Sequence, residues 1–322
     1  MDSLEINADL HIHSKYARAV SQKMEISILA KQAKLKGVDL LATGDCLHIK
    51  WLKHLRENLY GEGIFECNGM NFILQTEVQD KNRVHHVILL PSFSKLLELR
   101  EKFLKFSRNI DSDGRPWLNL NGEEIAEKVL ECNCLIGPAH AFTPYFGIYA
   151  HFNSLKACYG PYTKKLAFLE LGLSADSYLA DKISELHKLT FLSNSDSHSP
   201  FPLRLAREFN RMKIRDLSFE ELKKAFFQEN GRKVILNAGF YPEHGKYHLT
   251  RCKNCLTFYK LEDAKKLNWK CATCGGVIKK GVRDRIEEIA DNKENPNRAR
   301  YIHIYPLTEI IATAYGIKNF SL

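Results

Sequence analysis

The sequence lacks the segments that carry a chain into or across a membrane. Its first residues, MDSLEIN, hold no basic stretch followed by an apolar one, so no secretory signal is expected. No apolar run approaches the roughly 20 residues that a membrane-spanning helix needs. Internal repeats and low-complexity tracts are also missing, which argues against solenoid and low-complexity architectures. We therefore expect a cytoplasmic protein with no membrane partner.

A disulfide framework is not expected either, although the chain of 322 residues contains nine cysteines. Four of them form a metal-type cluster late in the chain, and five occur singly or on apolar segments. These five are Cys46, Cys67, Cys132, Cys134 and Cys158. Such a distribution is typical of buried free thiols in a reducing compartment. Hydrophobic residues at 44% and charged residues at 26% are ordinary for a soluble globular protein.

Alternating apolar and helical patterns predict an α/β domain with a mostly parallel sheet or barrel. Strands are expected at residues 4–10, 38–43, 72–78, 84–90, 135–136, 166–171, 190–193 and 233–238. Helices are expected at residues 24–36, 94–106, 123–131, 178–187 and 219–227. A change in composition then divides the chain into residues 1–243, a basic, cysteine-rich segment 244–284 and a short C-terminal helical segment 285–322.

Potential metal ligands stand at or next to the ends of six predicted strands. His11 and His13 are two residues apart on a strand, so they share a face. The other candidates are Asp45, His48, Glu77, His85, His86, His140, Asp196 and His198. In barrel and doubly wound folds, the C-terminal ends of the strands lie along one rim, so these candidates are expected to meet there. We expect two or three divalent ions there (Zn, Mn, Fe or Mg), which suits displacement at phosphorus.

Cys252-x2-Cys255 and Cys271-x2-Cys274 have the spacing of a zinc ribbon that holds one structural zinc. Residues 245–285 contain eleven Lys or Arg and three acidic residues, so this segment carries +8 of the net charge of +9. This charge indicates a polyanionic partner, or alternatively a solvated basic face. Candidate nucleic-acid contacts are Lys253, Lys260, Lys279, Lys280 and Arg204. Trp269 either stacks on a base or packs beneath the ribbon.

Five further polar residues have two interpretations, one functional and one structural. Glu170, Ser174 and Asp176 follow a predicted strand, and Arg204 and Arg207 follow the last metal motif. They either line a substrate pocket and neutralise phosphate or form ordinary salt bridges.

Several phrases resemble those of the PHP family of metal-dependent phosphoesterases, and within it the endonuclease Q family. They are ADLHIHSKYARA (8–19), ATGD (42–45), RVHHVILLP (83–91), GPAHAFTP (137–144), LELGLSAD (169–176), SNSDSHSP (193–200) and RLAREFN (204–210). The resemblance covers essentially the whole chain. It implies a distorted (β/α)7 barrel with a trinuclear metal centre, followed by a zinc ribbon. Family members continue beyond a segment like 301–322, so part of the DNA-holding sequence is expected to lie outside this chain.

The resemblance also implies individual roles. The metal ligands would be His11, His13, Glu77, His86, His140, Asp196 and His198, with Asp196, Glu77 and His140 as catalytic residues. Cys46 replaces a histidine of the second motif, which leaves Asp45 first and His48 next as its ligand. Because His85 and His86 point to opposite faces of a strand, only one should face the ions; His86 is chosen because it directly precedes the apolar run, as in the family.

The function implied by the resemblance is DNA repair. The chain would cut the phosphodiester 5′ to deaminated bases (uracil, hypoxanthine or xanthine) or abasic sites. Its partners would be damaged DNA and replication or repair proteins. Two alternatives remain: a small-molecule phosphatase of the histidinol-phosphate type, and a binding module with vestigial metals. The basic ribbon argues against the first, because a small ester needs no such appendage, and the complete ligand set argues against the second.

Overall fold

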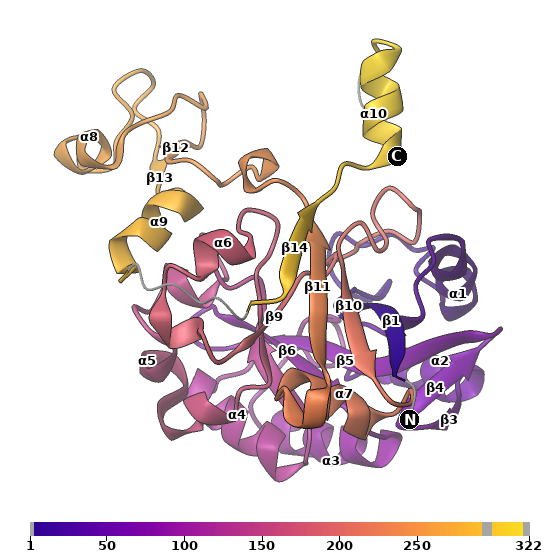
Figure 1. The fold of residues 1–322 in the computed structure, drawn as a ribbon. Coiled ribbons are helices and arrows are strands. Elements are labelled where there is room, and N and C mark those ends of the chain that lie inside the picture. Colours follow the sequence, from indigo (N-terminus) through magenta and orange to yellow (C-terminus); the bar gives the residue numbers. More distant parts are fainter. Residues whose placement is uncertain (1–2, 292–297, 318–322) are drawn as a thin grey trace.

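The computed structural model describes residues 3–291 and 298–317 and has a mixed α/β fold (Figure 1). The elements of the larger part are, in chain order, β1 (Leu4–Asp9), α1 (Ile26–Leu35), β2 (Leu40–Ala42), α2 (Ile49–Asn58), β3 (Tyr60–Glu62), β4 (Ile64–Cys67), β5 (Met70–Gln79), β6 (His85–Leu90), α3 (Phe93–Leu104), α4 (Gly122–Glu131), β7 (Leu135–Pro138), α5 (Leu155–Tyr159), β8 (Phe168–Glu170), α6 (Ser177–Ala180), β9 (Thr190–Leu192), β10 (Phe209–Ile214), α7 (Phe219–Phe226) and β11 (Lys233–Gly239). The remaining elements are β12 (Arg251–Cys252), α8 (Leu261–Lys266), β13 (Ile278–Lys279), α9 (Val282–Ile289), β14 (Arg300–His303) and α10 (Leu307–Ala314).

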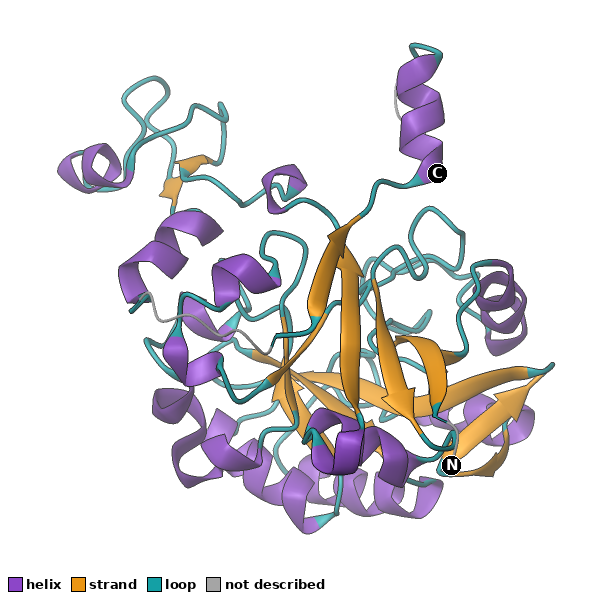
Figure 2. Ribbon diagram, in the orientation of Figure 1, coloured by secondary structure: helices purple, strands orange, loops and turns teal. Residues whose placement is uncertain are grey.

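The main sheet has ten strands, and helices cover its outer side (Figure 2). The expectation of a mostly parallel sheet is wrong. Parallel pairing is limited to β1–β2, β2–β5 and β11–β14, and the other six strand pairs of this sheet are antiparallel. The reason is connection length. A turn such as residues 80–84 between β5 and β6 is too short for a crossover, so it joins antiparallel neighbours.

Backbone hydrogen bonds extend the strand neighbourhood beyond this sheet. The Ala167 amide donates to the Ile136 carbonyl (2.9 Å) and so links β8 to β7, while β8 pairs in parallel with β9. The His13 amide donates to the Ser197 carbonyl (3.0 Å), which links the segment after β9 to the segment after β1. The residues that follow β1, β7, β8 and β9 are therefore held close together.

Four of the five predicted helices are present near their expected positions, as α1, α3, α4 and α7, whereas α2, α5 and α8 were not predicted. Along α1, Ile26, Leu29, Ala30 and Ala33 are buried, as the periodicity predicts. The helix expected over residues 178–187 is instead the four-residue α6 and a separate 3-10 turn. Arg298 explains the break: it donates to the Asp181 carboxylate (2.6 Å) and the Leu186 carbonyl (3.0 Å), so the segment bends around its guanidinium.

The C-terminal segment differs from the helical expectation. It begins within α9, but its next element is β14, which pairs in parallel with β11 in the main sheet. Among the described residues 298–317, α10 is the one helix, and it stands away from the sheet (Figure 1). The last five residues of this expected segment, 318–322, lie outside the described residues. Within residues 3–291 and 298–317, no helix is both long and apolar enough to cross a membrane.

Candidate metal centre and nucleic-acid interface

The two histidines after β1 direct their Nε2 atoms toward the same carboxylates. His13 Nε2 lies 3.0 Å from Asp196 Oδ1 and 3.6 Å from Glu77 Oε2. His11 Nε2 lies 3.7 Å from Glu77 Oε1 and 3.9 Å from Asp196 Oδ1. Both imidazoles are fully buried. The chain thus brings residues from three distant segments to one point.

Glu77 connects this group to a second one. Its Oε1 atom lies 2.9 Å from His85 Nδ1 and 3.0 Å from His140 Nε2. Three sets of donor atoms result, each lying within 4.8 Å of one another. They are His11, His13 and Glu77; His13, Asp196 and His198; and Glu77, His85 and His140. Because the first set shares His13 with the second and Glu77 with the third, ions held by neighbouring sets would share ligands.

The donor atoms fit divalent metal ions. Buried polar atoms normally have hydrogen-bond partners. Five atoms that point into the centre have none: the Nε2 atoms of His11, His13 and His198, Glu77 Oε2 and Asp196 Oδ1. Imidazole and carboxylate donors of this kind suit Zn, Mn or Fe.

Opposite charges couple the protonation of these groups. Burial by itself lowers the pKa of His11, but the Glu170 and Asp196 carboxylates outweigh it and raise that pKa to about 10. The pKa of His13 is likewise raised to about 9 despite burial, mainly by Asp45 and Asp196. Burial also opposes ionisation of Glu77 and Asp196, yet the surrounding histidines hold both pKa values well below their usual range. Metal binding at this centre must therefore release protons.

Two carboxylates contact the Nδ1 atoms of His11 and His13 and so orient both rings. Asp45 Oδ1 lies 2.9 Å from His13 Nδ1, and Glu170 lies 3.0 Å from His11 Nδ1. Glu170 also accepts from the His140 amide (2.8 Å) and Asn194 Nδ2 (2.9 Å). Such contacts fix the tautomer and orientation of metal-binding histidines. Sequence reasoning took Asp45 for a ligand and left Glu170 open; the available signal was a carboxylate between Leu169 and Leu171 at a strand end.

The geometry favours His85 over His86 as a candidate ligand, because His85 and not His86 lies in one of the three donor sets. The β5–β6 register places His85 opposite Gln79 and on the face of Glu77. His86 points the other way, with Nδ1 2.7 Å from the Tyr159 hydroxyl and Nε2 3.5 Å from Asp80. His48 is also absent from the three donor sets, and its ring stacks on Tyr16 with centroids 4.4 Å apart.

Substitutions at the two adjacent histidines should therefore have opposite effects. We expect His85→Ala to lower bound metal and turnover by about 10- to 100-fold, since a donor is lost. His86→Ala should leave turnover per folded molecule unchanged but destabilise the fold by about 2–4 kcal/mol, through a cavity and an unpaired Tyr159 hydroxyl. Metal analysis and thermal unfolding of both variants check this; the reverse pattern would restore His86 as the ligand.

A cavity of about 800 Å³ adjoins the second donor set. Asp196 and His198 form part of its wall, together with three cations, Lys23, Arg204 and Arg207. The basic side chains thus lie next to the candidate ligands, as expected for a site that receives phosphate. In contrast, Asp176 is structural: it caps α6 by accepting from the Leu179 amide (2.9 Å) and lies 3.0 Å from His303 Nε2.

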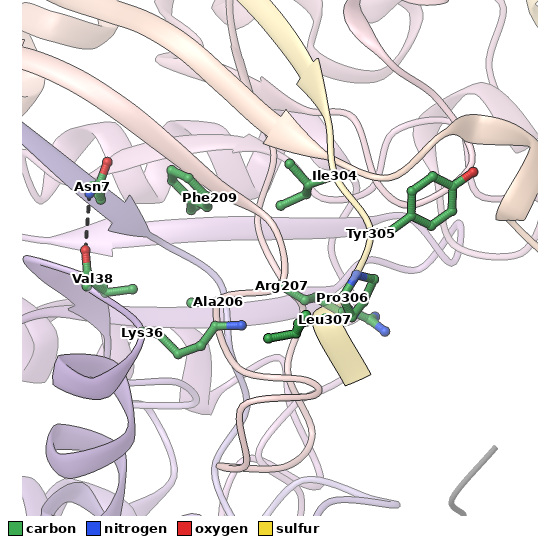
Figure 3. Close-up of a pocket in the computed structure, with 11 residues that line it drawn as sticks. Asn7, Lys36, Val38, Ala206, Arg207, Phe209, Ile304, Tyr305, Pro306 and Leu307 are labelled. Carbon is green, nitrogen blue, oxygen red and sulfur yellow. Dashed lines mark hydrogen bonds between the residues drawn. The ribbon is translucent and has the colours of Figure 1, made fainter. Parts of the chain in front are cut away.

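Arg207 also lines a second, smaller pocket of about 170 Å³ (Figure 3). Lys36 enters it from the end of α1, and Leu307 closes it from the start of α10. The Arg207 guanidinium donates to the Ser195 carbonyl (3.3 Å), while its Nε is buried without a partner. Arg207 therefore separates the cavity at the metal centre from the pocket beneath α10.

The four ribbon cysteines converge. Cys252 Sγ lies 3.5 Å from Cys274 Sγ, and Cys255 Sγ lies 3.5 Å from Cys271 Sγ. Tetrahedral zinc with Zn–S bonds of about 2.3 Å places sulfurs about 3.8 Å apart, so the cluster fits one zinc ion. Trp269 packs partly buried against the small ribbon core, with Lys280 Nζ 5.4 Å from its ring centroid.

The four ribbon lysines that were predicted to contact nucleic acid have three kinds of surroundings. Lys280 Nζ is paired with Glu288 (2.6 Å). Lys260 is exposed and immediately precedes α8. Lys253 and Lys279 extend over the Tyr145 ring, with Nζ 5.2 and 4.6 Å from its centroid.

No family model matches the chain. A relative of uncharacterised function from Methanocaldococcus jannaschii is 50% identical over 189 residues, which are 56% of this chain and 23% of that protein. This chain thus matches only about a quarter of the length of that relative. The uncharacterised protein YqxK of Bacillus subtilis is 29% identical over 327 residues, covering 94% of this chain and 82% of YqxK.

Two solved structures are similar over nearly the whole chain. One is the lesion-specific endonuclease PfuEndoQ from Pyrococcus furiosus, with 53% identity, a TM-score of 0.93, and coverage of 98% of this chain and 79% of that one. The other is an endonuclease Q in complex with a 27-mer duplex substrate that has an abasic lesion at the active site, with 52% identity, a TM-score of 0.94, and coverage of 98% and 80%. Given this identity over nearly all of its length, the chain belongs to the endonuclease Q family.

Proposed function

We propose that this protein is a metal-dependent DNA-repair endonuclease that cuts the phosphodiester 5′ to a deaminated base or abasic site and leaves a 3′-hydroxyl. The observation that carries the proposal is the run of three donor sets joined through His13 and Glu77, beside a cavity lined by Lys23, Arg204 and Arg207. It occurs in a chain half identical to endonuclease Q.

The residues that would hold the ions are His11, His13, Glu77, His85, His140, Asp196 and His198. Bound ions of this kind supply hydroxide near neutral pH and stabilise charge on the attacking and leaving oxygens. Asp45 and Glu170 act as positioning residues, because they fix the rings of His13 and His11. Arg204 and Arg207 neutralise the phosphate that enters the cavity. The four ribbon cysteines hold one structural zinc.

The metal centre belongs, in this proposal, to a distorted barrel of seven strands. The sequence β1, β2, β5, β6, β7 runs through paired neighbours, and the bonds from β7 to β8 and from the segment after β9 back to the segment after β1 support closure. The division into residues 1–243, 244–284 and 285–322 is retained with one change. The third segment adds β14 to the large domain.

Selectivity for damaged bases has a physical basis. A centre sunk in a rim cannot reach the backbone of regular duplex without distortion. Extruding a nucleotide exposes that phosphate, and it costs least where pairing is already weak. A pocket whose backbone N–H reads the carbonyl created by deamination would reject cytosine or adenine, because two donors would face each other unpaired.

The proposal is tested with end-labelled duplexes that differ at one position: abasic site, deoxyuridine, deoxyinosine or the undamaged base. With Mg or Mn present, we expect one nick 5′ to each lesion and none in the undamaged duplex. Equal cleavage of all four would refute the selectivity. Hydrolysis of histidinol phosphate without any nick would favour the small-molecule phosphatase.

A further inference from the structure

Three cations gather where the ribbon meets the rim of the large domain. Lys253 and Lys279 approach the Tyr145 ring from the ribbon, and the Arg83 guanidinium lies 5.3 Å from the centroid of the adjacent Phe146 ring. Both ammonium groups lie close to one ring centroid, so they are separated by no more than about 10 Å, roughly one Debye length at moderate salt. Like charges held at this distance repel each other unless an anion joins them.

The ribbon fold fixes the two lysines on one hairpin edge. Lys253 directly follows the zinc-site residue Cys252, and its amide donates to the Val277 carbonyl (2.9 Å). Lys279 pairs with Arg251 across the β12–β13 ladder. The hairpin that carries the first zinc-site cysteine therefore presents both ammonium groups, and Figure 1 shows β12 and β13 above α9.

The aromatic pair ties this cluster to the metal centre. Phe146 stacks on His85, with ring centroids 4.3 Å apart, and its carbonyl accepts from the His85 amide (2.9 Å). Tyr145 packs edge-on against Tyr247 at 5.3 Å, so the ring that both lysines approach also contacts the start of the ribbon segment. Phe146 thus contacts both a candidate metal ligand and Arg83, and it is adjacent in sequence to the ring that the two lysines approach.

The surroundings of Lys279 are positively charged. Partial burial lowers the pKa of Lys279, and the neighbouring charges of Lys253 and Arg83 lower it further. Lys280, by contrast, has Glu288 as a partner, and Lys265 of the same ribbon is also paired with that carboxylate (3.2 Å). A phosphate would relieve repulsion at the first cluster, but it would have to displace an existing partner at Lys280 or Lys265.

We propose that Arg83, Lys253 and Lys279 form a phosphate-binding cluster, arranged on Tyr145 and Phe146, that holds a backbone phosphate of the DNA duplex next to the metal rim. The cluster lets the ribbon and the metal centre bind one duplex together, so the ribbon aligns the strand with the centre. This inference rests on the proposed function, because it takes DNA as the ligand.

The test compares two double variants that remove the same charge. Lys253→Gln with Lys279→Gln removes the cluster lysines, and Lys265→Gln with Lys266→Gln removes two lysines of α8. Binding to an undamaged duplex is measured by anisotropy over a series of salt concentrations. Each lost phosphate contact lowers the salt slope by about 0.9 and weakens binding about fivefold near physiological salt. We expect a slope change near one for the cluster variant, because both lysines contact the same phosphate, and a much smaller change for the control. Zinc content and melting temperature establish that both variants are folded.

Cleavage of an abasic duplex separates this inference from the proposed function. The cluster variant should raise KM about fivefold with kcat within about twofold, because the ligands of the metal centre are untouched. If the wild type cleaves and both variants show equal slopes, the cluster does not exist as a phosphate site. If the wild type cleaves no duplex, the proposed function fails, and the slopes still decide whether the cluster binds phosphate.

Discussion

Asp196→Ala should abolish cleavage of lesion-containing duplex, lowering kcat by at least about 1000-fold. Asp196 Oδ1 lies 3.0 Å from His13 Nε2 and 3.6 Å from His198 Nε2, so its loss removes the carboxylate of the second donor set. The two imidazoles would then keep no common acidic partner, and an ion held there would lose its place beside the Arg204 cavity. Single-turnover cleavage of an abasic duplex measures the effect.

The control for this experiment is Asp216→Asn, which alters an exposed carboxyl between β10 and α7. It should cleave like the wild type. Asp196→Ala should stay folded, because the Asp196 side chain is 36% exposed and its removal leaves no buried cavity, so its circular dichroism and melting curve should resemble those of the wild type. Turnover within tenfold of the wild type in the folded variant would mean that the chemistry takes place elsewhere.

Cys271→Ser should unfold the ribbon while the large domain stays folded. The ribbon core consists of only four buried residues, Cys252, Ala264, Cys271 and Ile278, too few to fold without a metal. Zinc contributes on the order of 10 kcal/mol to folding in such modules, and a missing thiolate removes much of that stabilisation. We expect the loss of one zinc equivalent and rapid trypsin cleavage within residues 245–285, where the eleven basic side chains lie.

Cys67→Ser provides the comparison, since Cys67 is a buried free cysteine in β4, far from the ribbon in sequence. It should retain the zinc and resist trypsin. The same protease sensitivity should appear when a chelator strips the wild type, and readdition of zinc should reverse it. A ribbon that stays protease-resistant with no zinc bound would show that packing alone holds it.

The sequence alone was enough to find the segments that carry candidate donors and the type of metal chemistry that these donors suit. Ligand type and spacing are local properties: alternation along a strand puts His11 and His13 on one face, and two Cys-x2-Cys pairs suffice for a tetrahedral site. Apolar runs predicted eight strands of the large domain for the same reason, but they did not predict β3, β4, β10 or β14. The family phrases added a barrel and an endonuclease activity, which residue patterns could not supply.

Which side chains meet was decided only by tertiary structure. Because side chains alternate along a strand, His85 and His86 must point to opposite faces of the sheet. Only the β5–β6 register places His85, rather than His86, beside Glu77. Glu170 reaches His11 across 159 positions of the chain, and Asp45 reaches His13 across 32, through strand neighbours that no local pattern encodes. The antiparallel pairs and the addition of β14 to β11 have the same origin. Local sequence preferences determine whether a segment forms a helix or a strand. Which strands become neighbours is determined by the free energy of burying the apolar faces of sheets and helices against each other, and this free energy depends on the entire chain.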